Sequence, residues 1–267
     1  KGTEDVHQLR FIVPRPQRRP KALGYDKIII SGGSFGSHWR MAVMRFHPQI
    51  VERAVLSSLE GPDHTWDMPS YALNSLERIA AAAERDSGLR KHIPEGGLIQ
   101  ALASVIQQLE KEPVVVQVKH PNTGDMQSVR MDARAVRSLA LGYTATVRSR
   151  QGMPSWPADI LALYRGEYQA AAKALLRNRS SVRNWTARYF VLDCAAGISR
   201  ARKAQLDADP AVAVLGDISE IYRASCPVWG VDLGDDFRQN FDTEIPALLV
   251  HGTWDVSTPL ENAQELA

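Results

Sequence analysis

Two short apolar runs near the start of the chain, separated by an amphipathic stretch, predict the first structural elements. Lys27–Ser31 is rich in β-branched residues and is flanked by polar residues and glycines, which is typical of a buried strand. Ser37–Phe46 carries apolar residues at helical spacing and ends before Pro48. Ala54–Ser58 has the pattern of a second buried strand. The order strand, glycine-rich turn, helix, strand predicts a parallel sheet.

The pattern changes between residues 71 and 223, where helical periodicity dominates and the alternation of strands and helices stops. Two segments with strand-like alternation, Pro113–Lys119 and Gln127–Asp132, flank a Pro-Asn-Thr-Gly-Asp turn cluster and predict a β-hairpin. The segments with helical spacing are Leu73–Arg85, Leu98–Leu109, Ala135–Arg148, Pro157–Leu163, Tyr168–Leu176 and Ile198–Asp207. We therefore expect this region to be an insertion.

The buried-strand pattern returns at Ile245–His251, and a further helix begins near Pro259. Residues 4–13 also have helical spacing, and the basic, proline-rich segment 14–20 predicts a solvated loop, with a partner-binding or nucleic-acid motif as the alternative. We expect an α/β fold with a parallel sheet and a large, mostly helical inserted cap. The predicted boundaries are 1–70 for the first part of the core, 71–223 for the cap with its hairpin, and 224–267 for the return of the core.

The composition is that of an ordinary globular domain and narrows the possible partners. The 267 residues are 44% hydrophobic, enough for one sizeable core. With 32 basic and 30 acidic side chains, the formal net charge is +2, which gives no electrostatic reason to expect nucleic acid as a partner. No stretch approaches the ~18 apolar residues of a membrane span. We expect no cofactor and no metal; the compartment, cytoplasmic or secreted, and the oligomeric state stay open.

The segment Gly32–Gly36, Gly-Gly-Ser-Phe-Gly, contains the pattern Gly-x-Ser-x-Gly between the first predicted strand and the first predicted helix. In that position the pattern predicts a nucleophile elbow, a strained turn that presents the hydroxyl of Ser34 above the sheet. We expect that positions 32 and 36 require glycine because strand and helix pass close together there and a Cβ would collide. The backbone N–H of Phe35 would form half of an oxyanion hole. A glycine-rich turn with an unreactive serine is the alternative.

A second group of residues suited to catalysis follows the last predicted strand. Val250–Pro259 leads from the strand end through Gly252 to Asp255 and then to a helix that begins with proline. Asp255 would lie on a loop at the carboxyl edge of the sheet, where ligands bind in open α/β folds. A carboxylate there can hold a histidine in the required tautomer and stabilise its cation. For Asp255 alone, a helix cap or turn residue is the alternative.

These segments resemble the serine peptidases of the α/β-hydrolase fold that include proline iminopeptidases and tripeptidyl aminopeptidases. The resemblance covers nearly the whole chain. It is specific at Gly32–Ser37, with the following His47–Leu56, and at Ile245–Pro259, and it is looser between them. The resemblance implies a serine hydrolase of the aminopeptidase type in which Ser34 is the nucleophile and Asp255 is the acid of the catalytic triad.

Two parts of that family's catalytic machinery are expected outside the chain. The family's catalytic histidine follows the acid, so it is expected beyond Ala267, and the second oxyanion amide is expected before Lys1. We therefore interpret the chain as an internal portion of a larger hydrolase. The histidines within it are poor substitutes: His38 is expected to point away from Ser34, and His251 is expected to pack at the sheet edge.

The two cysteines, Cys194 and Cys226, are too few for a disulfide framework or for a zinc site of their own. They could be two buried thiols or one bridge. The resemblance, to secreted members in particular, implies the bridge. On the loop-entropy model, such a cross-link stabilises the fold by roughly 3–4 kcal/mol.

A peptidase that acts on free amino termini needs a negatively charged anchor for the ammonium group, because a buried unpaired charge is costly. Glu60 is the first choice, since it lies nearest to the end of the strand after the elbow; Asp63, Asp67 and, in the cap, Asp193 are further candidates. We thus expect an exopeptidase that releases residues from the amino terminus of peptides through an acyl-enzyme on Ser34. The alternatives are an esterase or other small-molecule hydrolase on the same scaffold, and an inactive α/β-hydrolase that serves as a binding module.

Overall fold

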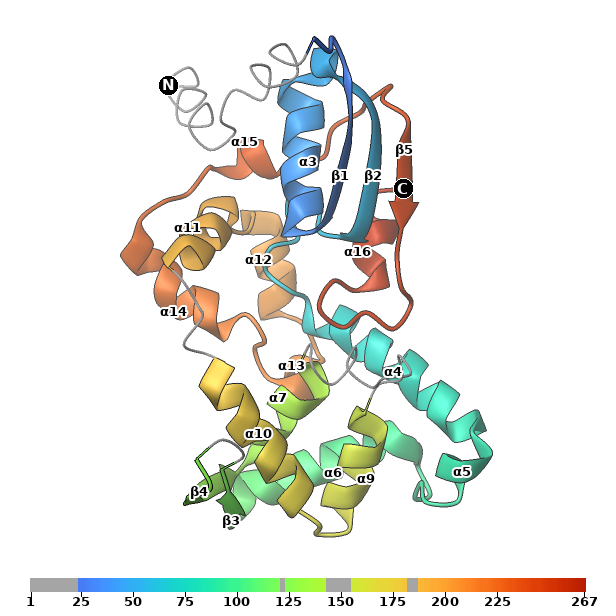
Figure 1. Cartoon of the computed structure of the whole chain (residues 1–267), viewed down its shortest axis with the longest axis vertical. Coiled ribbons are helices and arrows are strands. Elements are labelled where there is room, and N and C mark those ends of the chain that lie inside the picture. Colours follow the sequence, from blue (N-terminus) through green and yellow to red (C-terminus); the bar gives the residue numbers. More distant parts are fainter. Residues whose placement is uncertain (1–23, 121–122, 143–154, 182–186) are drawn as a thin grey trace. The chain divides into compact units, whose positions relative to one another are not determined.

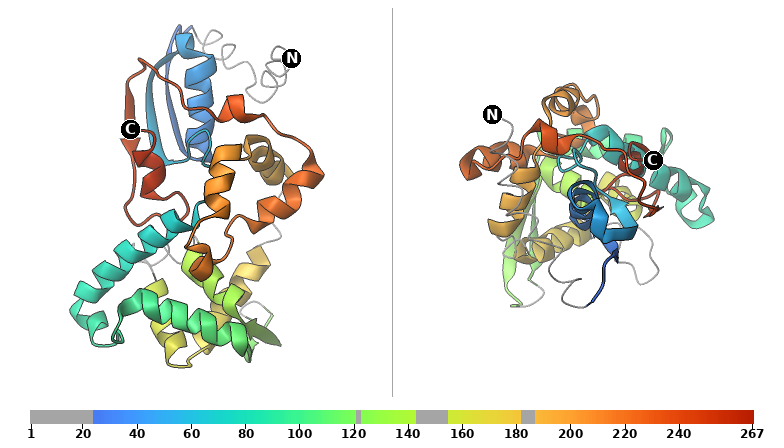
Figure 2. Two further views of the ribbon diagram at one scale, coloured as in Figure 1. Left: turned by 180° about the vertical axis from the view of Figure 1, so that it is seen from behind. Right: turned by 90° about the horizontal axis from the view of Figure 1, so that it is seen from above.

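The structure, a computed structural model, describes residues 24–120, 123–142, 155–181 and 187–267 (Figures 1 and 2). The chain divides into two compact units, each built from several segments. The sheet unit contains Lys1–Tyr71, Ala187–Asp209 and Asp217–Ala267, and the helical unit contains Ala72–Thr186 and Pro210–Gly216. Helix α4 (Pro69–Arg85) begins in the sheet unit and continues in the helical unit.

The sheet unit is built around three parallel strands in the order β1-β2-β5. β1 (Ile28–Ser34) leads into α3 (Phe35–Phe46), and a short helix η1 (Pro48–Ile50) connects α3 to β2 (Val51–Leu59). β5 (Ala247–Val250) pairs with the other side of β2. The chain is therefore a mixed α/β protein with a parallel sheet, which confirms this part of the sequence-based prediction.

Helix α3 packs against one face of the sheet (Figure 1), and the alternation of side chains along the strands decides which residues it covers. Ile30 and Leu56 are buried in the same apolar cluster as Met41 and Met44 of the helix. The large apolar side chains that stay exposed on the strands are Ile29, Val55, Leu248 and Val250. Within the described residues, this second set is open to solvent.

Helices α11 (Ala187–Ala196) and α14 (Glu220–Trp229) pack against each other in the sheet unit. A disulfide joins Cys194 of α11 to Cys226 of α14, with an S–S distance of 2.11 Å and a Cα–Cα distance of 5.0 Å. This is the pairing that the resemblance implies. The cross-link joins residues 32 positions apart and so restricts the unfolded chain more than the folded one.

The chain returns to the sheet through α15 (Asp235–Arg238), where Arg238 is buried. A buried guanidinium is tolerated only when it is well paired. Its Nε donates a hydrogen bond to the carbonyl of Ala196 at 2.6 Å, and its other nitrogens pair with Asp232 and Asp235. This segment is thereby fixed to the end of α11. Two more helices of the sheet unit are α12 (Arg200–Asp207) and α16 (Leu260–Gln264).

The helical unit contains one β-hairpin. β3 (Val114–Lys119) and β4 (Met126–Met131) pair antiparallel with Val116 opposite Val129, which confirms the predicted hairpin. The helices of this unit, besides most of α4, are α5 (Ser87–Arg90), α6 (Gly97–Lys111), α7 (Ala133–Leu141), α9 (Trp156–Tyr164), α10 (Gln169–Ser181) and α13 (Val212–Leu215). Leu102, Ile106, Trp156 and Ile160 are among its fully buried side chains.

Some predicted elements fall wholly or partly on residues outside the described ranges. The helix expected over 4–13 and the loop over 14–20 lie outside them, and the helix expected over 135–148 is described as α7 only up to Leu141. Residues 187–209 and 217–223, which were expected in the cap, group with the sheet unit. The inserted cap itself stays a prediction. In the part of the chain that the structure describes, no helix has the length and apolarity to cross a membrane.

Candidate active site

Ser34 lies at the junction of β1 and α3, where the backbone is strained. Its φ is 54° and its ψ is −135°. A positive φ is unusual for a residue with a side chain, and it persists only where the surrounding structure enforces it, commonly at functional sites. The strand, tight turn and helix that the Gly-x-Ser-x-Gly pattern predicts are therefore present around Ser34.

The two glycines that flank the turn have different roles. A Cβ on Gly32 would lie 2.3 Å from the carbonyl oxygen of Gly36, so any side chain there would displace the start of α3. A Cβ on Gly36 would meet no atom within 4 Å. The expectation that close packing requires a small residue is thus correct for Gly32 and wrong for Gly36. Gly33 is also confined, since its Cβ would lie 2.8 Å from the hydroxyl of Ser57.

The hydroxyl of Ser34 is exposed and is not used to cap its helix. Ser34 is the N-cap residue of α3, yet its side chain makes no capping hydrogen bond, although serines at this position usually do. Phe35, the next residue, is the first of the helix, so its N–H has no acceptor within α3. A reactive hydroxyl beside such an N–H is the arrangement that acyl transfer uses.

Parallel pairing brings the segments that follow the three strands to one edge of the sheet. Ser34 ends β1, Glu60 directly follows β2, and the loop with Asp255 follows β5. β2 is the middle strand, so Glu60 leaves the sheet between the other two segments. The fold thus places three of the predicted site residues at the same edge.

Asp255 organises the loop after β5. Its Oδ1 accepts hydrogen bonds from the N–H groups of Ser257 and Thr258, both at 3.0 Å, and its Oδ2 accepts one from the Thr258 hydroxyl at 2.8 Å. His251 donates from Nε2 to the carbonyl of Thr258 at 2.6 Å and accepts the N–H of Leu59 at Nδ1, at 3.0 Å. Because an N–H can only donate, the ring carries its proton on Nε2. His251 thus holds the Asp255 loop against the end of β2.

Glu60, Asp67 and Asp193, called here the acidic group, lie close enough to influence one another. Burial raises the pKa of Glu60 well above its ordinary value, and the charges of Asp67 and Asp193 raise it further. Burial raises the pKa of Asp67 to about 7; Arg202 opposes this shift, whereas Asp193 and Asp255 add to it. Glu60 and Asp67 keep partial exposure to solvent. Partly accessible carboxyl groups with raised pKa values are typical of binding and catalytic sites.

Glu265, directly after α16, is a carboxyl group whose pKa is lowered, in contrast to those of Glu60 and Asp67. It accepts hydrogen bonds from His64 Nε2 at 2.8 Å, from Arg202 at 2.9 Å and from the hydroxyl of Tyr71. Burial alone would raise the pKa of Glu265, but the bonds from His64 and Tyr71 and the charge of Arg202 outweigh it and lower the pKa to about 2. Arg202, which is paired with Glu265, also lowers the pKa of Asp67 through its positive charge.

Two of the predicted amine anchors have other partners. Asp63 accepts the N–H of Ser199, the N-cap of α12, at 2.7 Å and so fixes the start of that helix. Asp193 is buried and accepts a hydrogen bond from the hydroxyl of Tyr222 at 3.0 Å, while it also contributes to the acidic group. The structure therefore brings Asp193 and Glu60 together and gives Asp63 a structural contact.

His38 lies one turn into α3 and packs against the segment after β2. Its Nδ1 donates to the carbonyl of Gly61 at 2.8 Å, and its ring stacks on that of Phe35 with 5.1 Å between the centroids. Burial lowers the pKa of His38 to about 4, so the ring is neutral near pH 7. His38 thus supports the first turn of α3 as a neutral side chain.

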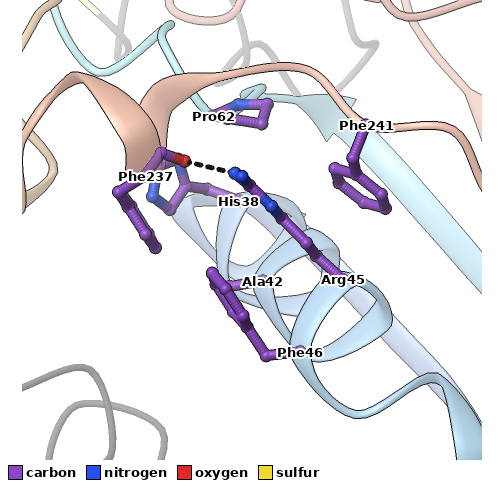
Figure 3. A pocket seen from close by; sticks show the side chains of 7 residues that line it. All are labelled: His38, Ala42, Arg45, Phe46, Pro62, Phe237 and Phe241. Carbon is purple, nitrogen blue, oxygen red and sulfur yellow. Dashed lines mark hydrogen bonds between the residues drawn. The ribbon is translucent and has the colours of Figure 1, made fainter. Parts of the chain in front are cut away.

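A small pocket beside α3 opens next to His38 (Figure 3). Arg45 crosses it and donates a hydrogen bond to the carbonyl of Phe237 at 3.1 Å. The volume is about 10 Å³, which is room for roughly one water molecule and too little for a peptide. Its lining consists of His38, Ala42, Arg45, Phe46, Pro62, Phe237 and Phe241.

Sequence patterns did not indicate Ser37, Arg202 or Glu265 as residues of the site. Ser37 is fully buried, and its place directly after the elbow motif is the only local signal that could have suggested it. Arg202 and Glu265 are 63 residues apart and meet only through the fold. No local pattern reports such a pair.

No protein-family model matches the chain, and no curated protein matches it. Over the described ranges, no three or more His, Cys, Asp or Glu side chains are grouped so that they could hold a metal ion. The fold and the site together define a mixed α/β protein with a strained, exposed serine at the carboxyl edge of a parallel sheet.

Proposed function

We propose that this protein is a serine hydrolase of the α/β-hydrolase type that releases residues from the amino terminus of peptides. The observation that carries the proposal is the backbone of Ser34, with φ of 54° between a parallel strand and a helix. A strained turn of this kind costs on the order of 1–3 kcal/mol. Such a cost is retained where the turn serves to present the serine hydroxyl.

The roles follow from the positions at the sheet edge. The hydroxyl of Ser34 gives its proton to the general base and attacks the carbonyl carbon of the scissile bond, and the N–H of Phe35 stabilises the oxyanion. The C–N bond then breaks, the shortened peptide leaves as an amine that takes up this proton, and the amino-terminal part stays on Ser34 as the acyl-enzyme. Asp255, oriented by its own loop, holds the imidazole of the general base. We assign that base to none of His38, His64 or His251, because each is hydrogen-bonded to the backbone of Leu59 or Gly61.

The acidic group supports a preference for free amino termini. Glu60 leaves the sheet between the segments of Ser34 and Asp255, and Asp67 and Asp193 lie near it. Carboxyl groups that repel one another gain when a cation enters between them, since the ammonium offsets both burial and mutual repulsion. A free amino terminus is such a cation. A wholly apolar site would instead have favoured a neutral ester.

The test compares two substrates in protein expressed from its complete reading frame: a short peptide p-nitroanilide with a free amino terminus, and its N-acetylated form. We expect kcat/KM to be ten- to a thousandfold higher for the free form, the ~1.5–4 kcal/mol of a lost charged hydrogen bond. Ser34→Ala abolishes turnover of both. Glu60→Gln lowers turnover of the free form selectively, and Glu52→Gln, an exposed change on the strand that precedes Glu60, leaves it unaltered.

Equal turnover of the two forms would favour the esterase alternative. Absence of turnover with any acyl substrate would favour the inactive binding module. Either result would refute the aminopeptidase proposal.

A further inference from the structure

The N–H groups of the last residue of β2 and of the two residues after it are bound by side chains. The N–H groups of Leu59, Glu60 and Gly61 donate to His251 Nδ1 at 3.0 Å, to Ser37 Oγ at 2.9 Å and to His64 Nδ1 at 3.0 Å, respectively. The carbonyl of Gly61 accepts from His38 Nδ1 at 2.8 Å. These four side chains, Ser37, His38, His64 and His251, are called the Glu60 clamp.

Members of the Glu60 clamp bind a second partner on their other side. Nε2 of His251 donates to the Thr258 carbonyl in the Asp255 loop at 2.6 Å, and Nε2 of His64 donates to Glu265 at 2.8 Å. Both rings accept an N–H at Nδ1, which fixes their tautomers. Through Leu59, the residue before Glu60, His251 therefore ties the end of β2 to the loop that carries Asp255.

Ser37 connects its two partners through a single oxygen atom. It is fully buried on the first turn of α3. Its hydroxyl donates to the carbonyl of Ser34 at 2.7 Å and accepts the N–H of Glu60 at 2.9 Å. One oxygen atom thus joins the backbone of the proposed nucleophile to the backbone of the proposed amine anchor.

We propose that Ser37 is a positioning residue that fixes the spacing between Ser34 and Glu60 and so determines which peptide bond, counted from the amino end, reaches the nucleophile. This inference rests on the proposed function. An extended peptide advances about 3.4 Å per residue, so a displacement of Glu60 by a fraction of that length misaligns the bound substrate. A misplacement of about 1 Å can cost a hundredfold in rate.

Ser37→Ala removes the bridging oxygen and leaves the Glu60 N–H without its partner. We expect the kcat/KM of the free-amine peptide p-nitroanilide to fall about tenfold or more, mainly through KM, whereas hydrolysis of p-nitrophenyl acetate by Ser34 changes by less than about threefold. Mass spectrometry of products from an unlabelled peptide should show release at a neighbouring bond as well. Amide hydrogen exchange at Glu60 should accelerate in the variant.

Ser37→Thr, which keeps the hydroxyl, should keep the wild-type preference. If Ser37→Ala does not fold, Ser37→Cys, of similar volume but weaker hydrogen bonding, takes its place and should show the same selective loss on the free-amine substrate. Ser75→Ala, a buried serine of α4 in the helical unit, is the matched control and should leave both activities unchanged. Equal losses on both substrates, or an unchanged preference in Ser37→Ala, would overturn the positioning role alone. A wild-type protein without any preference for free amines would overturn it together with the proposed function.

Discussion

Gly32 and Ser34 each make the elbow possible, Gly32 by its lack of a side chain and Ser34 by its positive φ. A Cβ on Gly32 would lie 2.3 Å from the carbonyl oxygen of Gly36, so only glycine lets strand and helix approach this closely. Ser34 takes the positive φ that turns the chain into α3. The positive φ of Ser34 is unfavourable in isolation. Their combination raises an exposed hydroxyl at the start of a helix, where the helix dipole favours negative charge on a neighbouring oxygen.

Alanine at the two glycines separates these contributions. Gly32→Ala should lower the free energy of unfolding by roughly 2–3 kcal/mol, because its Cβ collides with backbone that cannot move without displacing α3. Gly36→Ala should be neutral or should stabilise by up to ~1 kcal/mol, because the site is open and alanine favours the helix. Urea unfolding of both variants measures the difference. Similar losses at both positions would show that the helix start is crowded on both sides.

At this scale the sequence indicates the residues that belong to local motifs. Ser34 and Asp255 can be found because each lies on the short connection between a strand pattern and a helix signal. The contact between Arg202 and Glu265, and the bond from Ser37 to Glu60, depend on packing between distant segments. Such contacts leave no periodicity or spacing in the chain.

The segment between β2 and α4 brings Glu60 and Asp67 to the edge of the sheet, and their shared environment has a measurable cost. Burial raises the pKa of Asp67 to about 7, whereas an aspartate in an unfolded chain titrates near 3.9. Between these two pH values the folded state keeps a proton that the unfolded state has released. The free energy of unfolding therefore falls as the pH rises from about 4 to 7, and the penalty is complete above that range.

Asp67→Asn removes this penalty. The variant should exceed the wild type in unfolding free energy by on the order of 2 kcal/mol at pH 8 and by much less at pH 4, because at pH 4 the wild-type carboxyl is protonated in the folded state. Urea titrations at the two pH values provide the comparison. Asp236→Asn, at an exposed position of α15, is the control and should show no such dependence on pH. A variant that is less stable at pH 8 would contradict the burial of charge at Asp67.

Elements with strong local patterns could be predicted, and elements that depend on tertiary contacts could not. The patterns of short, buried apolar runs indicate β1, β2 and β5, and alternation on both sides of a turn cluster indicates the hairpin. α14 contains Pro227, which disfavours a helix locally, yet the helix forms where the disulfide joins it to α11. The sequence pattern predicts no helix at α14, and the structure forms one there in contact with α11.

For the molecule as a whole, the sheet unit alone carries the proposed chemistry. Ser34, Glu60, Asp193 and Asp255 all belong to it, although Asp193 comes from a segment that follows the helical unit in the chain. A hydrolase of this kind needs the strands to place nucleophile and acid at one edge, and the distant segment adds the buried carboxylate. The helical unit supplies none of these four side chains.

The central claim is that Ser34 is a nucleophile, and covalent trapping tests it most directly. Protein expressed from its complete reading frame is incubated with a fluorophosphonate, digested and analysed by mass spectrometry. We expect a single phosphonyl adduct, located on the peptide that contains Ser34, and no adduct in Ser34→Ala. An adduct on another residue, or no adduct on the wild-type protein, would contradict it.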